Sequence, residues 1–448
     1  MADRPTEPGP EDSPAGRGAR AGAAIRGIAV DLAPLRVSRP YRRMWFGQLV
    51  SHTGSQITVV AIFVQVYDLT NSAAAVGLVG LFQLIPLVIV SIGGGAIVDH
   101  LDRRKIVIAC ELAFAALSGV LLVNALLPEP SLAVVYVAAA LVAGLVGLEW
   151  PARAAMTPRL VGEELVPSAM TLSQLMFNAT TLVGPAVGGV IIARLGLGWA
   201  YGIDLASYSV AILAAVLLPP MPPERAEGEP EPRGWGAIRE GFAFLKGRRV
   251  IQGTFWIDLV AMIFGMPRAL FPVLAGPAFF GVGATGVGLL FAAPAAGALI
   301  AAGASGWVRR VRHQGRAVMW SVVVWGAAIA GFGFVGVILR DWFWLALVFL
   351  AVAGAADLIS AVFRGTILVT AVPDRLRGRL VAINILVVTG GPRIGDFEAG
   401  AVAQLVSPLF SVISGGLVCI AGVGLLAWLS PALARYHAGD DELAPTDR

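Results

Sequence analysis

Long apolar segments recur along almost the whole chain, and each is about the length needed to cross a bilayer. Such a segment needs roughly 20 mostly apolar residues, because the hydrocarbon core is about 30 Å thick and backbone polar groups must bond within the helix. Of the 448 residues, 57% are hydrophobic and only 14% are charged, which is too few charges for a water-covered surface. The pattern predicts an all-α membrane protein.

Breaks between the apolar runs divide them into twelve predicted spans. Residues 1–40 mix Pro, Gly and both charge signs and are expected to form a disordered cytosolic tail. Residues 436–448 are expected to form a second cytosolic tail. No cleavable signal peptide is recognisable, so the first span is expected to direct insertion. The spans are predicted at 44–67, 72–98, 105–127, 131–150, 168–193, 198–218, 249–273, 283–307, 316–339, 342–363, 380–403 and 409–434.

Basic residues are concentrated on one side of the predicted membrane. Eighteen Lys and Arg residues, among them Arg153 and Arg159, fall in loops on the side of the termini, whereas only Arg194 and Arg340 fall on the other. Cytosolic loops carry such an excess. We therefore expect a multi-pass protein of the bacterial inner membrane with both termini in the cytosol. The same rule accounts for the net charge of +4 without a nucleic-acid partner.

The longest loop, residues 219–248, begins Pro- and Glu-rich and ends in an amphipathic segment, as expected of a linker between two halves. Six spans lie on each side, so the predicted domains are 41–218 and 249–435. Gly184-Pro185-Ala186-Val187-Gly188 in the fifth span matches Gly391-Pro392-Arg393-Ile394-Gly395 in the eleventh. This correspondence indicates a six-plus-six parallel repeat.

A glycine-rich stretch ends the second span and leads into a basic loop. The stretch resembles the loop motif of the major facilitator superfamily, although His100 and Asp102 depart from the usual residues. The resemblance implies the superfamily's twelve-helix fold of two six-helix pseudo-repeats and a latch that closes the cytosolic side in the outward-facing state. The residues of this predicted switch are Gly95, Asp99, Arg103 and Arg104.

The fifth span contains a second motif, formed by Gly184, Pro185, Gly188 and Gly189. Proline leaves a backbone carbonyl unpaired, and the glycines permit bending and close packing. The stretch resembles the fifth-helix motif of superfamily antiporters, which implies export. The alternative is a packing kink that carries no information on direction.

Three further stretches, Thr70-x-Ser72, residues 151–161 and residues 373–379, resemble the enterobactin-exporter and macrolide-efflux branch of the superfamily. The resemblance covers nearly the whole chain and implies export of siderophores or lipophilic drugs by proton antiport. Many relatives carry an acidic residue in the first helix, where this chain has Ser55 and Gln56. The resemblance therefore supplies no coupling residue there.

Ionisable and strongly polar residues within predicted spans are candidates for the transport site, because such groups cost a few kcal/mol at membrane depth. His52 and Gln56 lie on one face of the first span, and Asp258 and Arg268 lie in the seventh. In the superfamily, helices 1, 4, 7 and 10 line the central cavity. These residues are therefore predicted to face it.

The tenth span adds Asp357 and Arg364, which lie on the same face as Ser360. Asp357 is predicted to contribute to the cavity. For Arg364 two interpretations remain open, a functional group or a member of the cytosolic basic collar. The alternative to a transport role for all these charges is a structural one, in which they form fixed ion pairs between helices.

The eleventh span carries Arg393, Asp396 and Glu398. Arg393 and Asp396 share a face and are expected to neutralise each other, whereas Glu398 lies off that face with no obvious partner. A buried carboxyl without a base binds a proton near neutral pH more readily than an exposed one. Glu398 is therefore predicted to be a proton carrier, with Asp204 and Glu111 as weaker candidates.

Other classes of protein receive little support. The chain has four histidines, no phosphate-binding glycine loop, and two cysteines, Cys110 and Cys419, within apolar runs, so we expect neither an enzyme nor a metal site or cofactor. The expected partners are a small-molecule substrate, protons and the lipid bilayer, with the protein a monomer. The remaining rival is a proton-coupled uptake symporter of the same fold.

Overall fold

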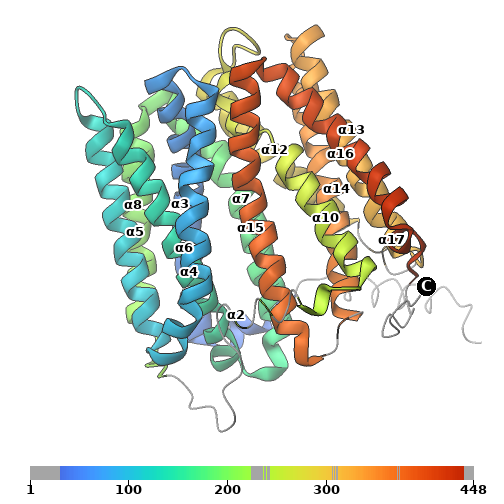
Figure 1. Ribbon diagram of the computed structural model, residues 1–448. Coiled ribbons are helices and arrows are strands. Elements are labelled where there is room, and N and C mark those ends of the chain that lie inside the picture. The colour runs from blue at the N-terminus through green and yellow to red at the C-terminus, as the bar shows by residue number, and fades with distance from the viewer. Residues whose placement is uncertain are drawn as a thin grey trace, which may run out of the picture.

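The computed structural model describes residues 31–222, 243–304, 311–370 and 374–437, with isolated positions between these ranges at 236, 239, 306, 308 and 372. The described chain is helical and contains no strand (Figure 1). Most of the predicted N-terminal tail and linker and nearly all of the C-terminal tail lie outside these residues. The tail prediction was too long at its end, because α2 (Ala33–Val37) and the start of α3 lie within 1–40.

Six long helices form the N-terminal half, which occupies the blue-to-green side of Figure 1. A one-turn 3₁₀ segment, η2 (Glu163–Leu165), joins two of them. The six are α3 (Arg39–Thr70), α4 (Ala73–His100), α5 (Arg103–Leu126), α6 (Leu132–Val161), α7 (Val166–Leu195) and α8 (Leu197–Val216).

The C-terminal half repeats this order after the linker. Its first crossing is interrupted, and a short helix, α17 (Pro431–Arg435), follows its last. The elements are α10 (Arg249–Phe264), η3 (Arg268–Leu270), α11 (Phe271–Ala275), α12 (Gly283–Gly303), α13 (Gln314–Ile338), α14 (Phe343–Thr370), α15 (Asp374–Leu405) and α16 (Pro408–Leu429).

Eleven helical segments of the described chain are long and apolar enough to cross a bilayer, with α10 to α11 counted as one. The twelfth crossing is α15, which runs alongside them but carries several charges within its length (Figure 1). The fold is therefore the predicted twelve-helix membrane fold in two six-helix halves.

Several helices begin at a side-chain cap, which explains where the spans start. Ser38, Ser72 and Ser407 accept hydrogen bonds from backbone N–H groups in the first turns of α3, α4 and α16. Asp102 does the same for α5 through the N–H of Arg104. These bonds satisfy N–H groups that have no partner inside the helix.

The two halves share one packing pattern. In the N-terminal half α3 packs on α7 and α8, α4 on α6, and α5 on α6 and α8. In the C-terminal half α10 packs correspondingly on α15 and α16, α12 on α14, and α13 on α14 and α16. Each pairing in one half has its counterpart at the same place in the other, which is the arrangement of a parallel repeat.

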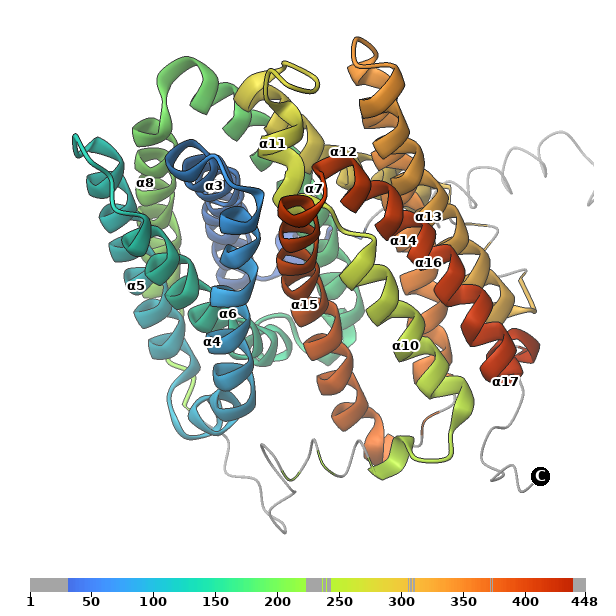
Figure 2. The same cartoon turned by 45° about the horizontal axis from the view of Figure 1, so that its top comes forward.

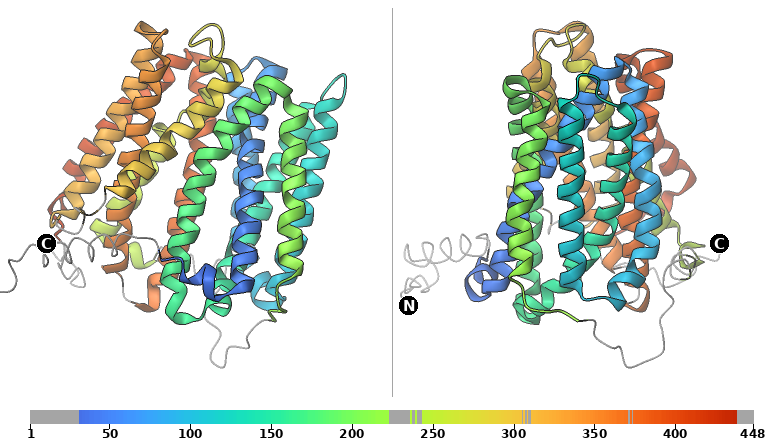
Figure 3. Two further views of the ribbon diagram at one scale, coloured as in Figure 1. Left: turned by 180° about the vertical axis from the view of Figure 1, so that it is seen from behind. Right: turned by 90° about the vertical axis from the view of Figure 1, so that its left-hand side faces the viewer.

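The halves meet along two helix pairs, α4 with α15 and α7 with α12 (Figures 1 and 2). We call the side on which both described chain ends lie the terminal side, and the opposite side the far side. The close contacts between the halves lie toward the far side, and the C-terminal helices lean away toward the terminal side (Figure 3).

Glycines make this far-side contact possible. A Cβ atom on Gly77 would lie 2.6 Å from the carbonyl oxygen of Asp396, and one on Gly400 would lie 2.9 Å from the Cα of Gly77. At the second pair, a Cβ on Gly189 would lie 2.9 Å from the Cα of Gly288. Backbones approach this closely in membranes only where side chains are small.

The predicted spans differ most from the observed helices at the fourth and the seventh crossing. The fourth was expected to end at residue 150, but α6 continues to Val161 and retains two prolines within it. The seventh was expected to be continuous, but it breaks between Phe264 and Arg268, where Pro267 cannot extend the hydrogen-bond ladder of α10. The carbonyl oxygen of Gly265 accepts a hydrogen bond of 3.0 Å from the indole N–H of Trp325.

Candidate functional site

Three charged side chains form a buried cluster inside the N-terminal half, which we call the N-cluster: Glu111 on α5, and Glu149 and Arg153 on α6. The guanidinium of Arg153 pairs with both carboxylates. Glu111 is buried, whereas Glu149 keeps 18% of its side chain exposed. Two acids around one base leave one negative charge in excess when all are ionised.

The prediction that Arg153 lies in a cytosolic loop was wrong. Its side chain is 9% exposed and lies within α6, because that helix extends about three turns beyond the expected end. Glu149 was not predicted at all. The available signal was the spacing of Glu149 and Arg153 by four residues, which places opposite charges on one helical face.

A second set of three charges lies in the C-terminal half, and we call it the C-cluster: Asp258 on α10, and Asp357 and Arg364 on α14. Arg364 pairs with the buried Asp258, and its other terminal nitrogen lies 3.9 Å from Asp357. Asp357 keeps 35% of its side chain exposed. The fixed ion-pair interpretation thus describes Asp258 and Arg364, while Asp357 lies beside that pair and is partly exposed.

The two arginines occupy equivalent places. Arg153 and Arg364 each lie 21 residues beyond the first residue of their helix, Leu132 and Phe343, and α6 and α14 are counterparts in the repeat. Both clusters contain two carboxylates, one enclosed and one partly exposed. The clusters of the two halves therefore carry one arginine and two carboxylates each, at a similar depth.

A third ion pair lies beside the contact between the halves. Arg268 in η3 bonds the carboxylate of Asp396 on α15 at 2.6 and 3.4 Å, and Asp396 is fully buried. The expected local pairing of Arg393 with Asp396 is replaced by this longer-range bond. Arg393 instead donates to the carbonyl oxygen of Thr389, one turn earlier on α15.

Glu398 is partly buried on α15 and has no hydrogen-bond or ion-pair partner within the described part of the chain. It lies on α15, which packs on α4 of the other half. Its role in proton carriage stays a prediction.

His52 and Gln56 on α3 both contact α7. The ring of His52 lies 5.6 Å from that of Phe177, and the amide of Gln56 donates to the hydroxyl of Thr181 at 3.3 Å. Ser55 turns the other way and bonds Tyr208 of α8 at 2.8 Å. The polar face predicted for α3 is thus divided between two neighbouring helices.

The predicted switch motif is only partly described. Gly95 and Asp99 belong to the last turns of α4, but their side chains lie outside the described residues. Arg104 donates to the carbonyl oxygens of Ala215 and Val216 at the end of α8. The carbonyl of Ala215 also accepts a hydrogen bond of 3.2 Å from the N–H of Leu218. Arg104 thus adds a side-chain cap to the end of α8 inside its own half.

Asp102 and Arg103, which neighbour Arg104 in the motif, bind the chain just beyond the end of α8. Asp102 accepts a hydrogen bond of 3.1 Å from the N–H of Met221, beyond the end of α8. The backbone N–H of Arg103 donates to the carbonyl oxygen of Met221 at 3.2 Å. Asp102, which departs from the superfamily motif, thus holds the loop onto α8.

The fifth-helix motif lies where three helices meet. A Cβ on Gly184 would lie 2.5 Å from the Cβ of Gln56, and Gly188 faces Ile57, so both glycines pack on α3. Gly189 faces α12 of the other half. The motif therefore allows α7 to approach both its own half and the opposite one.

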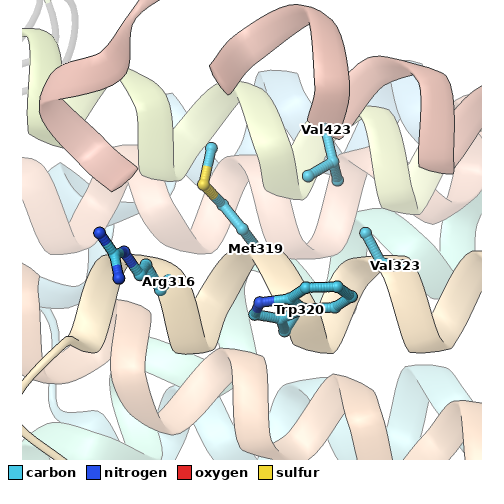
Figure 4. A pocket seen from close by; sticks show the side chains of 5 residues that line it. All are labelled: Arg316, Met319, Trp320, Val323 and Val423. Atoms are coloured by element: carbon cyan, nitrogen blue, oxygen red, sulfur yellow. The ribbon is translucent and has the colours of Figure 1, made fainter. Parts of the chain in front are cut away.

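A groove of about 200 Å³ lies away from these clusters, between α13 and α16 (Figure 4). Arg316, Met319, Trp320, Val323 and Val423 line it. Trp320 is 67% exposed, as expected of a side chain that faces lipid. We assign this groove no part in transport.

Within the described residues, no three His, Cys, Asp or Glu side chains lie close enough to hold a metal ion. Cys110 and Cys419 are both buried and free.

The model of one protein family, described as transmembrane secretion effector, matches residues 29–443. This match spans nearly the whole chain. The chain belongs to that family of the major facilitator superfamily. It is therefore a multi-pass membrane transporter.

Curated relatives include the enterobactin exporter EntS of Citrobacter koseri, which is 28% identical over 419 residues, 91% of this chain and 96% of the relative. EntS of Shigella boydii is 28% identical over 429 residues, 93% of this chain and 98% of the relative. This chain thus resembles proteins named exporters over their full length.

Solved structures share the fold at low sequence identity. A POT family transporter in complex with 5-aminolevulinic acid superimposes with a TM-score of 0.71 at 11% identity, covering 88% of this chain and 97% of that one. The nucleoside transporter NupG gives 0.69 at 14%, covering 89% and 100%. At such identity the likeness concerns the fold alone.

Proposed function

We propose that the protein is a secondary active exporter of the bacterial inner membrane that exchanges protons for a small molecule by alternating access. The terminal side is the cytosolic side in this proposal, because it carries the excess of Lys and Arg. The substrate class is a siderophore or a lipophilic, drug-like compound. Full-length similarity to proteins named enterobactin exporters supports export.

The observation that carries proton coupling is the pair of equivalent charge clusters. Each contains one carboxylate more than its arginine neutralises, and one acid in each, Glu149 or Asp357, is partly exposed. A carboxylate that alternates between an arginine partner and a proton links protonation to helix packing. Movement of one charge through about 150 mV supplies roughly 3.5 kcal/mol, enough for a gradient of a few hundredfold.

Contact between the halves on the far side supports the alternating-access part of the proposal. Closure there leaves the substrate path toward the cytosol, the state in which an exporter loads its cargo. Arg268 and Asp396 lie beside this contact, and Asp396 packs against Gly77 of the other half. The loop with Asp99 and Arg103 is proposed to close the cytosolic side in the alternate state.

The test measures direction and energy source separately. Cells that lack the gene are compared with complemented cells for accumulation of two probes, a catechol siderophore and a macrolide. Export predicts higher accumulation in the deletion strain, and uptake predicts lower. In liposomes, flux of the transported probe should follow an imposed pH or voltage difference, and a requirement for ATP would contradict proton antiport.

A further inference from the structure

Asp204 on α8 is a buried acid in an unusual setting. Its side chain is 1% exposed, and one carboxylate oxygen, Oδ2, accepts hydrogen bonds from Thr58 on α3 at 2.7 Å and from Ser118 on α5 at 2.6 Å. The other oxygen, Oδ1, is buried and has no hydrogen-bond partner among the described residues. Neutral hydroxyls thus surround the group on one side only.

The other buried acids of the described chain are held differently. Glu111, Asp258 and Asp396 each pair with an arginine, whereas no cation contacts Asp204 in the described residues. A buried carboxylate without a cation costs several kcal/mol, which a bound proton removes. The free Oδ1 is the atom at which that proton fits.

Gly54 of α3 shapes the space beside this oxygen. A Cβ at that position would lie 2.8 Å from Oδ1 of Asp204, so any larger residue would crowd the carboxyl group. The backbone of α3 therefore approaches the acid closely. A proton fits on this side, whereas a water molecule or a larger ligand has little room.

Asp204 also lies in the middle of a row of polar side chains between α3 and α8. On its far side, the hydroxyl of Tyr201 donates to Gln65 at 2.7 Å. On its terminal side, Tyr208 and Ser55 bond at 2.8 Å. Residues 201, 204 and 208 lie on one face of α8 because of the helical period.

The terminal-side end of this row lies toward the N-cluster. Glu111 lies on α5, the helix that also supplies Ser118, and is nearer its terminal-side end. Glu149, at the other end of that cluster, is partly exposed. Ionisable groups on the helices packed around Asp204 include Glu111, Tyr201, Tyr208, His52, Cys110, Tyr67, Asp68 and Arg194, the last at the far-side end of α7.

We propose that Asp204 is a proton-binding site of the N-terminal half, which exchanges its proton through Tyr208 and the N-cluster. The site takes up one H⁺ at Oδ1 to form the neutral carboxyl and releases one H⁺ to restore the carboxylate. It rests on the proposed proton-driven transport, and it gives Asp204, a weaker candidate in the sequence, a defined proton-binding atom and a route for exchange.

The test uses the purified full-length protein in lipid nanodiscs and needs no substrate. A pH jump is followed by a pH-indicator dye and by infrared absorption of protonated carboxyl groups. Asp204→Asn should release one proton fewer per protein and lose one carboxyl band. Asp68→Asn, at the exposed far-side end of α3, is the matched control and should leave that band in place.

A second variant covers the case in which Asp204→Asn fails to fold. Hydroxyl donors favour the ionised form of a carboxyl, so Thr58→Val should move proton release from this group to higher pH without loss of the band. Unchanged proton release in both variants overturns the proposal. So does a band that responds to Na⁺ at constant pH, which would make the ligand a metal cation.

The outcomes remain separable from the proposed function. Direction of transport is read from probe accumulation in cells, which does not depend on how many protons the purified protein binds. Loss of one released proton in Asp204→Asn together with uptake in cells would keep the site and refute export. Normal export with unchanged proton release would refute only the site.

Discussion

Closure of the far side depends on glycine at the contact of α7 with α12, and the substitution Gly189→Ala tests this directly. The added Cβ would lie 2.6 Å from the carbonyl oxygen of Ala284 and 2.9 Å from the Cα of Gly288. Ordinary contact begins at 3.4 Å, so the helices must separate by about 0.8 Å. Both nearest atoms belong to backbone, which cannot rotate away.

In the proposed alternating-access cycle the far side opens and these two helices separate, so the cost falls on the far-side-closed state. Overpacking of this kind costs about 1–3 kcal/mol. An energy of that size shifts an equilibrium between two states by about 5- to 150-fold. Gly189→Ala should therefore move the population toward a state that is open on the far side.

Spin-label distances between the halves measure this population. Cysteines at Glu129 and Asp341 place labels on exposed far-side loops of opposite halves, while Cys110 and Cys419 are buried. The fraction of long distances should rise in Gly189→Ala. Gly77→Ala at the other contact should act in the same direction, since its Cβ would lie 2.6 Å from the carbonyl oxygen of Asp396.

Gly202→Ala on α8 is the matched control, because a Cβ there would meet nothing within 4 Å. It makes the same chemical change within a helix but should leave the distances as in the parent protein. If Gly189→Ala and Gly77→Ala both gave the parent distribution, close packing of these helices would not limit closure, and the reasoning would be refuted.

Three further predictions concern the motif, the eleventh helix and the broken helix. Asp99→Asn should lower transport several-fold at normal membrane insertion, and full efflux would remove the motif's role. Glu398→Gln mimics a protonated carboxyl, so substrate binding should persist while flux loses its pH dependence; an unchanged dependence would make Glu398 structural. Trp325→Phe leaves the carbonyl of Gly265 without its donor and should cost about 1–3 kcal/mol of stability, read as a lower melting temperature.

Side-chain partners could not be predicted from the chain, even where the charged residues themselves were recognised. Asp258 and Arg268 were both placed in the seventh span without partners, whereas Asp258 pairs with Arg364 and Arg268 pairs with Asp396. Helical spacing gives the face on which a charge lies, yet it does not say which other helix that face meets. Arg153 was misplaced for a related reason, since hydropathy marks the membrane boundary and not the end of a helix that continues into water.

The sequence by itself determined the membrane fold, the twelve crossings and the repeat of two halves. These follow from hydropathy and helix-breaking residues, which are local properties of each segment, and from a motif shared by the fifth and eleventh helices. Tertiary structure alone decided that Glu111 and Arg153, Asp258 and Arg364, and Gly189 and Gly288 come together. Such pairs depend on the rotation and tilt of whole helices, which are set by packing across the bundle and leave no record in the local sequence.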